Sequence, residues 1–188
     1  MKTNFLEQLI VIVKKNIKKL VSILIVIIIL LFIFLFNQNL QEKNKIQVAD
    51  KYVKATILIK QKNTKESKLI LEDIIKKNHQ FYSPLALYLL IDNGIEADNE
   101  KIINFFDIII KNSSIDEENL NLIKIKKAIF LINIDNEELI VETLNPIINR
   151  DSVWKDLSIK LISEYFLSKD QKVKANEYLQ LLEINNNK

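Results

Sequence analysis

The sequence predicts an all-α protein in which a single N-terminal transmembrane helix precedes a tetratricopeptide-like α-solenoid of about four helical hairpins. Three observations support this prediction: an apolar run of seventeen residues, a helical pattern that recurs every 35 or 36 residues after it, and a scarcity of turn-forming residues. One Gly and two Pro in 188 residues are too few for the tight turns of an all-β fold.

The apolar run is Leu20–Phe36, in which Ser22 carries the one polar side chain. As a helix it would extend roughly 25 Å, close to the thickness of the hydrocarbon core of a bilayer. Lys18 and Lys19 precede it and can extend their ammonium groups into the interface. No A-x-A-like cleavage site follows it, so we expect an uncleaved transmembrane signal anchor.

Residues 1–19 are expected to form a short basic tail in the cytoplasm. Five lysines lie in it, namely Lys2, Lys14, Lys15, Lys18 and Lys19. The tail contains a single acidic residue, Glu7, whereas acidic residues lie among the three lysines that follow the apolar run. The positive-inside rule therefore predicts that the C-terminal domain lies outside the cytoplasm. Within the tail, residues 5–13 fit either an interfacial amphipathic helix or the beginning of the anchor helix.

The C-terminal domain is close to neutral. Five of the 27 basic residues and one of the 24 acidic residues precede the apolar run, which leaves 22 basic and 23 acidic residues after it. The overall net charge of +3 therefore does not indicate a nucleic-acid partner. The absence of Cys excludes disulfides, thiolate metal sites and cysteine nucleophiles.

Residues 37–188 are expected to form one helical-repeat domain, with its first hairpin near residues 46–78. One face of the first helix is predicted from residues at three- and four-residue steps: Ile46, Ala49, Val53, Thr56, Ile57 and Lys60. Thr64 is expected to cap the second helix, because a threonine hydroxyl can accept a hydrogen bond from a free backbone N–H group.

The second hairpin is expected near residues 81–112. Ser83 followed by Pro84 predicts a helix start, since the N–H group that proline lacks has no helical partner at that position. Gly94, the only glycine, is placed to end this helix, and Asp98 is expected to cap the next one.

The third and fourth hairpins are expected near residues 116–149 and 152–184. Asp116–Glu118 place negative charge at a helix start, where the helix dipole favours it. Asn136 is expected to start the return helix, which is predicted to close at Pro146. Ser152 is expected to cap the first helix of the last hairpin.

The four hairpins recur at a regular spacing. They begin near Ile46, Phe81, Asp116 and Ser152, which are 35, 35 and 36 residues apart. A period in the mid-thirties built from two helices is typical of tetratricopeptide-type repeats. Alternating strands at Ile57–Lys60 and Leu122–Lys126 are the disfavoured alternative, because Ile is abundant throughout and no turn glycines accompany these segments.

Four segments form the pattern of the last repeat: Leu144–Ile147, Val153–Leu157, the turn Lys169–Asp170, and Ala175–Leu179. They resemble the last repeat of the membrane-anchored tetratricopeptide-like proteins of Gram-negative bacteria related to the ancillary subunit of the Sec translocon. The side-chain match covers about forty residues, and the architecture covers the whole chain. The sequence departs from this family in its few small residues at helix crossings.

The resemblance implies a bacterial inner-membrane protein that crosses the membrane once, with a cytoplasmic N-terminus and a periplasmic repeat domain. It also implies envelope proteins as partners, among them the Sec translocon or periplasmic chaperones. The expected role is to assist the secretion, chaperoning or assembly of envelope proteins.

No constellation of residues predicts an enzyme, a cofactor site, a metal site or a small-molecule substrate. His79 is the only histidine, and it is expected to lie in a solvated connection. The carboxylate pairs Glu117–Glu118 and Glu137–Glu138 fall in first helical turns, where they complement the helix dipole.

Aromatic residues are expected to fill the core between repeats: Phe81, Tyr82, Phe105, Phe106, Trp154, Tyr165, Phe166 and Tyr178. Tyr52 and Tyr88 are the expected exceptions, because either can face the concave side of the solenoid and contact a partner.

Two functions are compatible with these features. The first is a membrane-tethered interaction module whose repeats bind polypeptides, with the tether raising their effective concentration at the membrane. The second is a structural assembly factor of an envelope complex, for cytochrome maturation, division or outer-membrane assembly, that acts through its transmembrane helix. Because Leu20–Phe36 lacks a small-xxx-small pattern and ionisable residues, the sequence favours the first.

Overall fold

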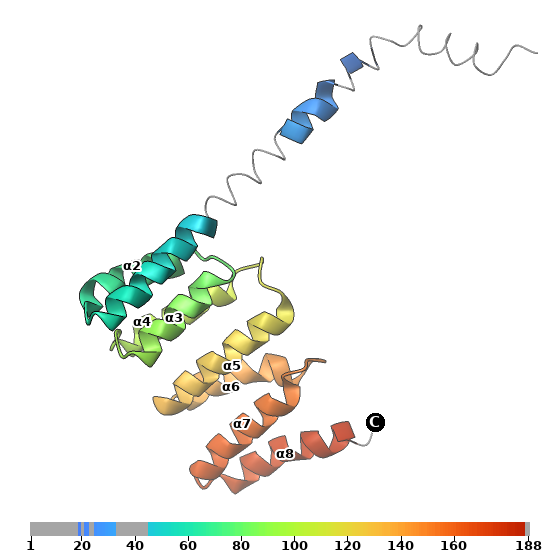
Figure 1. Ribbon diagram of the computed structural model, residues 1–188. Helices are drawn as coiled ribbons and strands as arrows, with labels where there is room; N and C mark the ends of the chain where they lie inside the picture. The colour runs from blue at the N-terminus through green and yellow to red at the C-terminus, as the bar shows by residue number, and fades with distance from the viewer. Residues whose placement is uncertain (1–18, 20, 23–24, 33–44, 187–188) are drawn as a thin grey trace, which may run out of the picture. The chain divides into compact units, whose positions relative to one another are not determined.

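The computed structural model describes residues 19, 21–22, 25–32 and 45–186, and all the regular secondary structure in them is helical (Figure 1). The chain divides into two compact units, Met1–Gln47 and Val48–Lys188. The fold and the candidate site described below belong to the second unit.

The prediction of a transmembrane helix at Leu20–Phe36 is wrong for the part of the chain that the structure describes. No helix among those residues combines the length and the apolar composition needed to cross a membrane. Leu20 and residues 33–36 lie outside the described residues.

The basic tail lies almost entirely outside the described residues. Of the four lysines expected to set the topology, only Lys19 is described, whereas Lys14, Lys15 and Lys18 are not. Residues 5–13 are not described either. The topology that these residues imply stays a prediction.

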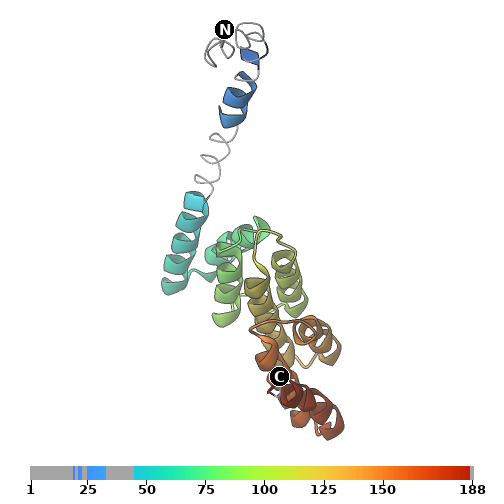
Figure 2. The same cartoon turned by 90° about the vertical axis from the view of Figure 1, so that its right-hand side faces the viewer.

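The second unit has an all-helical, repeat-like fold. It begins within the helix of residues 45–60 and continues through seven further helices: α2 (Thr64–Lys76), α3 (Tyr82–Asp92), α4 (Asn99–Ile110), α5 (Glu117–Asn133), α6 (Glu137–Ile148), α7 (Lys155–Ser168) and α8 (Lys172–Asn186). Each of α2 to α7 packs against the helix that follows it, and α2 also contacts α4. The resulting helical pairs are stacked in chain order (Figures 1 and 2).

The same hydrogen-bonded turn closes each helical pair. A backbone N–H group bonds to the carbonyl five residues earlier, in the pairs Asn63 to Leu58, Ile95 to Leu90, Asn136 to Leu131 and Gln171 to Phe166, at 2.9 to 3.1 Å. The residue before each donor has a positive φ: Lys62, Gly94, Asp135 and Asp170. This arrangement is the Schellman motif, and its recurrence gives the fold its repeat-like character.

Asp98 is confirmed as the cap of the helix it precedes, and Asp116 and Asn136, which were expected only at helix starts, are N-caps as well. Each side chain accepts a hydrogen bond from the backbone N–H group three residues on. The prediction that Thr64 caps α2 is wrong by one residue. Asn63 is the N-cap, and its amide oxygen accepts from Glu66 N at 3.3 Å.

Two predicted caps have other roles in the structure. Ser83 lies inside α3, which begins at Tyr82, and its buried hydroxyl donates to the carbonyl of Ile74 at 2.8 Å. Ser152 precedes α7 without capping it, and its hydroxyl donates to Glu118 at 2.9 Å. The Ser83 hydroxyl thereby joins α3 to α2. The Ser152 hydroxyl joins the start of α7 to α5, and its oxygen also accepts a hydrogen bond from the backbone N–H group of Trp154 at 3.2 Å.

Two predictions about the backbone also differ from the structure. Pro146 lies inside α6, which continues to Ile148 instead of closing at the proline. The segments considered as alternating strands, Ile57–Lys60 and Leu122–Lys126, are helical.

The helix of residues 45–60 buries a different face from the predicted one. Val48, Ala55 and Leu58 are buried, whereas Val53 and Ile57 are 56% and 49% exposed. Both sets recur at helical spacing, because isoleucine and valine are so frequent that this helix has two apolar stripes. Packing against α2 and α3 decides which stripe is covered.

The core consists of two clusters of buried side chains that meet in α5. Ile123 belongs to the N-terminal cluster and Ile125 to the C-terminal one. The partly buried Phe130 packs against the first cluster, and Ile103 of α4 packs against the second. The clusters therefore interlock, and α5 holds the two halves of the unit together.

Candidate binding groove

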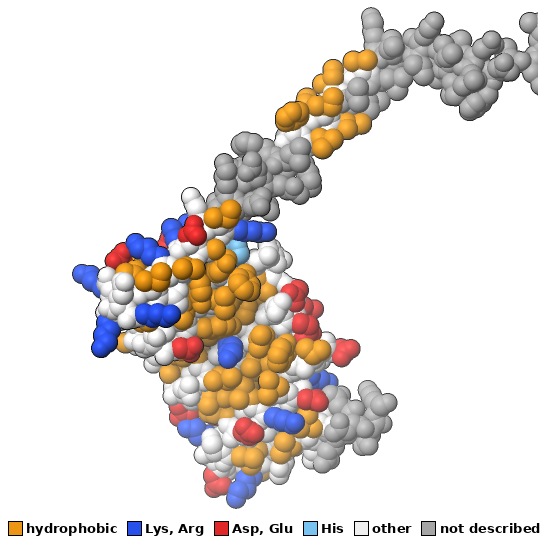
Figure 3. Space-filling view, in the orientation of Figure 1, with side chains coloured by type: hydrophobic (Ala, Val, Ile, Leu, Met, Phe, Trp, Pro, Cys, Tyr) orange, Lys and Arg blue, Asp and Glu red, His pale blue; other side chains and the backbone are white. Residues whose placement is uncertain are grey.

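A groove lies between α3 and α5. It consists of two hollows, of about 430 Å³ at the beginnings of these helices and about 220 Å³ further along them. Tyr88 lines both hollows. Figure 3 shows apolar side chains gathered on the face that α3 and α5 present.

The apolar wall on the α3 side follows from helical periodicity. Phe81, Leu85 and Tyr88 are spaced by four and three residues, so they form one stripe beside the groove. The neighbouring stripe, which includes Leu87 and Leu90, is fully buried in the N-terminal core cluster. Burial of Leu87 and Leu90 sets the rotation of α3 about its axis, and this rotation turns the stripe of Phe81, Leu85 and Tyr88 towards α5.

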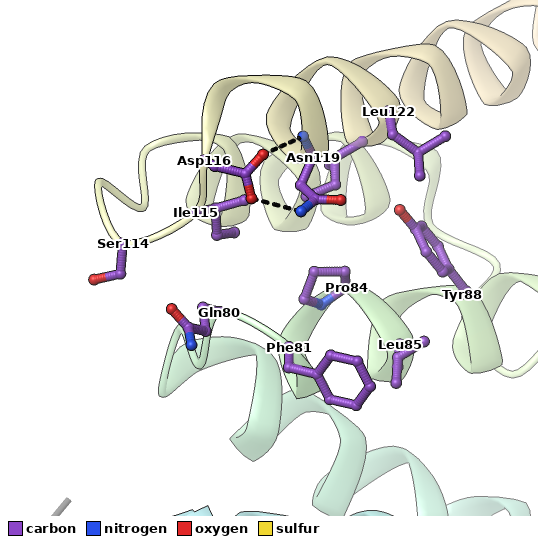
Figure 4. Close-up of a pocket in the computed structure, with 11 residues that line it drawn as sticks. Gln80, Phe81, Pro84, Leu85, Tyr88, Ser114, Ile115, Asp116, Asn119 and Leu122 are labelled. Atoms are coloured by element: carbon purple, nitrogen blue, oxygen red, sulfur yellow. Dashed lines mark hydrogen bonds between the residues drawn. The ribbon is translucent and has the colours of Figure 1, made fainter.

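The wall on the α5 side combines apolar and polar side chains. Leu122 and Ile123 continue the apolar surface, and Asp116 and Asn119 stand at its N-terminal end. Figure 4 shows Asp116 and Asn119 across the hollow from Pro84 at the start of α3.

Asp116 is held as a carboxylate by its role as N-cap. Its two oxygens accept hydrogen bonds from the backbone N–H and the side-chain amide of Asn119, at 3.0 and 2.5 Å. These hydrogen bonds lower the pKa of Asp116 below its ordinary value. The first hollow therefore has a negative charge at its rim at neutral pH.

Tyr88 separates the two hollows as a neutral phenol. Burial raises the pKa of Tyr88 to about 12, so the hydroxyl keeps its proton at neutral pH. The ammonium group of Lys126, an exposed residue of α5, lies 5.9 Å from the centre of the Tyr88 ring.

The second hollow has an aromatic and aliphatic lining. The rings of Phe106 and Phe130 lie 6.2 Å apart and tilted by 40°. Ile129 also lines it and is 41% exposed. Lys126 and Asp92 supply opposite charges, so this hollow is close to neutral.

The structure places the two predicted groove residues differently. Tyr88 lines the groove, whereas Tyr52 packs against Tyr82 with ring centres 5.6 Å apart at the edge of the N-terminal core. Whether either contacts a partner stays a prediction.

Most of the aromatic residues expected in the core are buried or partly buried. Phe105, Phe106, Tyr165 and Phe166 are the buried ones. Phe81 differs, because it is 60% exposed at the edge of the groove. Its position just before the first turn of α3, four residues from Leu85, is the sequence feature that distinguishes it from the core aromatics.

The residues considered for chemistry have structural roles in the described part of the chain. The Nδ1 atom of His79 accepts hydrogen bonds from the backbone N–H groups of Phe81 and Tyr82, at 3.1 and 3.2 Å. Glu137 pairs with Lys174 at 2.7 Å. Within the described ranges, no three His, Cys, Asp or Glu side chains are grouped to hold a metal ion.

Comparison of the chain with family models, with curated proteins and with solved structures finds no match. The relationship to the ancillary subunit of the Sec translocon, with the localisation and partners it implies, stays a prediction from the sequence.

Proposed function

We propose that the protein is a protein-interaction module in which a tetratricopeptide-like solenoid binds a polypeptide segment in the groove between α3 and α5. The observation that supports this function most directly is the open apolar lining of the groove. Phe81 and Ile129 are 60% and 41% exposed, and they lie at the two hollows on either side of Tyr88. Apolar surface that lines a concave site is typical of binding sites.

The form of the groove favours a polypeptide over a compact ligand. The two hollows follow one another along α3 and α5, with Tyr88 between them. They therefore form an elongated groove and not a single enclosed cavity. A chain segment with two bulky apolar side chains can place one in each hollow. Grooves between helices bind amphipathic helices and extended segments in this way.

The stacking of helical pairs supports the same function. A stack of similar pairs forms an extended surface from equivalent helices, and such surfaces bind polypeptides in other repeat proteins. Envelope proteins, the Sec translocon or chaperones are proposed partners only through the resemblance of the last repeat. The alternative function, a structural assembly factor, depends on a transmembrane helix, and no helix among the described residues is long and apolar enough to be one.

The experiment that tests this function is a selection of random 12-residue peptides displayed on phage, with the full-length protein as the target. The binding of enriched peptides is then measured by fluorescence anisotropy. The double variant Phe81→Ala, Ile129→Ala removes exposed groove side chains, so we expect it to weaken binding at least tenfold. Loss of one to two buried apolar contacts accounts for a factor of about that size.

The matched control is Leu69→Ala, Leu167→Ala, which removes two exposed apolar side chains outside the groove. This control should bind as the wild type does, and circular dichroism should show that both double variants stay folded. Equal weakening by the two double variants, or no enriched peptide at all, would contradict the proposed function.

A further inference from the structure

We infer that the first hollow of the groove selects basic–apolar segments, and that Asp116 is the residue that provides this selectivity. A lysine or arginine of the partner would place its aliphatic part against Phe81 and Leu85, and its charged group would reach Asp116. This inference rests on the proposed function and names the chemistry of the segment that the groove binds.

The charge of the first hollow comes from one residue. Asp116 is the only charged side chain among those that line it. No Lys or Arg in the described part of the chain forms an ion pair with this carboxylate. Its oxygens accept hydrogen bonds from the backbone N–H and the side-chain amide of Asn119, and backbone N–H groups at the start of α5 add to these, so its partners are neutral donors and not cations.

The surroundings of Asp116 leave the negative charge in place. The dipole of α5 contributes about half a positive charge at its N-terminus, which offsets only part of the carboxylate. Glu117 and Glu118 follow directly, and of these Glu117 is paired with Arg150 at 2.9 Å. Lys126 is ten residues further along α5, about 15 Å away, which is beyond the screening length of about 8 Å in physiological salt.

The shape of the hollow suits an amphipathic side chain. Lysine and arginine bury their methylene groups along apolar surface while the charged end stays at the rim. A neutral apolar side chain would cover the same wall but leave the carboxylate without a counter-charge. An acidic side chain would be repelled. The expected order of preference at this position is therefore basic, then neutral, then acidic.

The same phage selection with the full-length protein tests the inference. We compare the wild type with Asp116→Asn, which removes the charge and keeps a good N-cap, because asparagine caps helices as well as aspartate does. The matched control is Asp98→Asn, which makes the same change at the N-cap of α4, outside the groove.

We expect peptides enriched on the wild type to contain an excess of lysine and arginine beside bulky apolar residues. Asp116→Asn should abolish this excess, and Asp98→Asn should not. For one enriched lysine peptide, Asp116→Asn should raise the Kd roughly three- to fivefold in low salt, and the factor should shrink in high salt.

The outcomes separate the inference from the proposed function. Enriched peptides without a basic excess, or with an excess that survives Asp116→Asn, would overturn the inference and leave the function intact. Peptide binding that is insensitive to the Phe81→Ala, Ile129→Ala double variant would overturn both.

Discussion

Glu96 shows at the scale of one residue how the repeats are joined. Its buried carboxylate lies between α2 and α4, 3.1 Å from Lys68 and 3.0 Å from Lys101. Lys101 also binds Glu72 of α2 at 2.6 Å. Burial raises the pKa of Glu96, but the ion pair with Lys101 and the hydrogen bonds from the backbone of Asp98 and from Lys68 outweigh burial and lower the pKa to about 2.

Replacement of Glu96 by Gln should therefore destabilise the protein in a pH-dependent way. The pKa of Glu96 is lower in the folded state than its ordinary value of 4.5, so its contribution is complete above about pH 4.5 and is lost between pH 4.5 and 2. At pH 7 we expect Glu96→Gln to lose about 1–3 kcal/mol of unfolding free energy, the usual range for a hydrogen-bonded charged group. Urea unfolding at pH 7 and at low pH measures the difference.

The control for this prediction is Glu100→Gln in the exposed first turn of α4. It should change the unfolding free energy by less than about 0.5 kcal/mol, as exposed substitutions usually do. A loss for Glu96→Gln that is the same at pH 7 and at pH 2.5 would show that the charge is not the cause.

At the scale of the element, the four hairpin turns share one backbone motif but differ in the residue at its left-handed position. Gly94 adopts φ +58° without steric cost, whereas Lys62 adopts φ 62° with a side chain. The side chain of Asp135 at the equivalent position has its own partners, because it accepts from Tyr165 at 3.0 Å and pairs with Lys169 at 2.6 Å.

These differences predict opposite effects of glycine exchange. Lys62→Gly should raise the unfolding free energy by about 0.5–1 kcal/mol because it relieves the left-handed strain. Gly94→Ala should lower it by a similar amount, since the space for a Cβ atom is open and only the backbone conformation is strained. Thermal unfolding followed by circular dichroism measures both changes.

Asp135→Gly serves as the comparison for these two variants, because it relieves the same strain but removes the contacts to Tyr165 and Lys169. It should be less stabilising than Lys62→Gly. A lower unfolding free energy for Lys62→Gly would contradict the prediction that the positive φ of Lys62 strains the turn.

At the scale of the whole unit, the stacked pairs make stability depend on neighbours. Helix α5 contacts both α4 and α6, and it contributes to both core clusters. Helix α8 packs against α7 at the end of the chain, and Ala175 is its one fully buried residue among those whose side chains are described. A terminal pair with neighbours on one side opens more easily than a central one.

Hydrogen exchange of the full-length protein should therefore be slowest in α5 and at least roughly tenfold faster in α8, because local opening costs less where fewer contacts are lost. Mass spectrometry of peptic fragments under conditions of fast reclosing resolves the two helices. Equal protection of α5 and α8 would show that the unit unfolds as one block.

The groove illustrates what sequence patterns can predict about a site. Tyr52 and Tyr88 were both expected to be able to face a concave surface, and of the two only Tyr88 lines the groove. Phe81 was assigned to the core, since composition does not distinguish an exposed aromatic residue from a buried one. Asp116 was expected to place negative charge at the start of a helix, and its position at the rim of a hollow depends on α3, about thirty residues earlier in the chain.

The sequence by itself determined the features that arise within a few residues of the chain. The helical character of the second unit, the caps at Asp98, Asp116 and Asn136, and the helix end at Gly94 all depend on local hydrogen bonds and backbone preferences. These interactions are complete within one or two turns, so their residues suffice to predict them.

Only the tertiary structure decided which apolar stripe of the helix over 45–60 is buried, and which side chains of α3 and α5 stay open to a partner. An isoleucine-rich helix has more than one apolar stripe, so periodicity predicts the helix but not its buried face. Packing between helices far apart in the chain selects that face, and the same selection forms the groove.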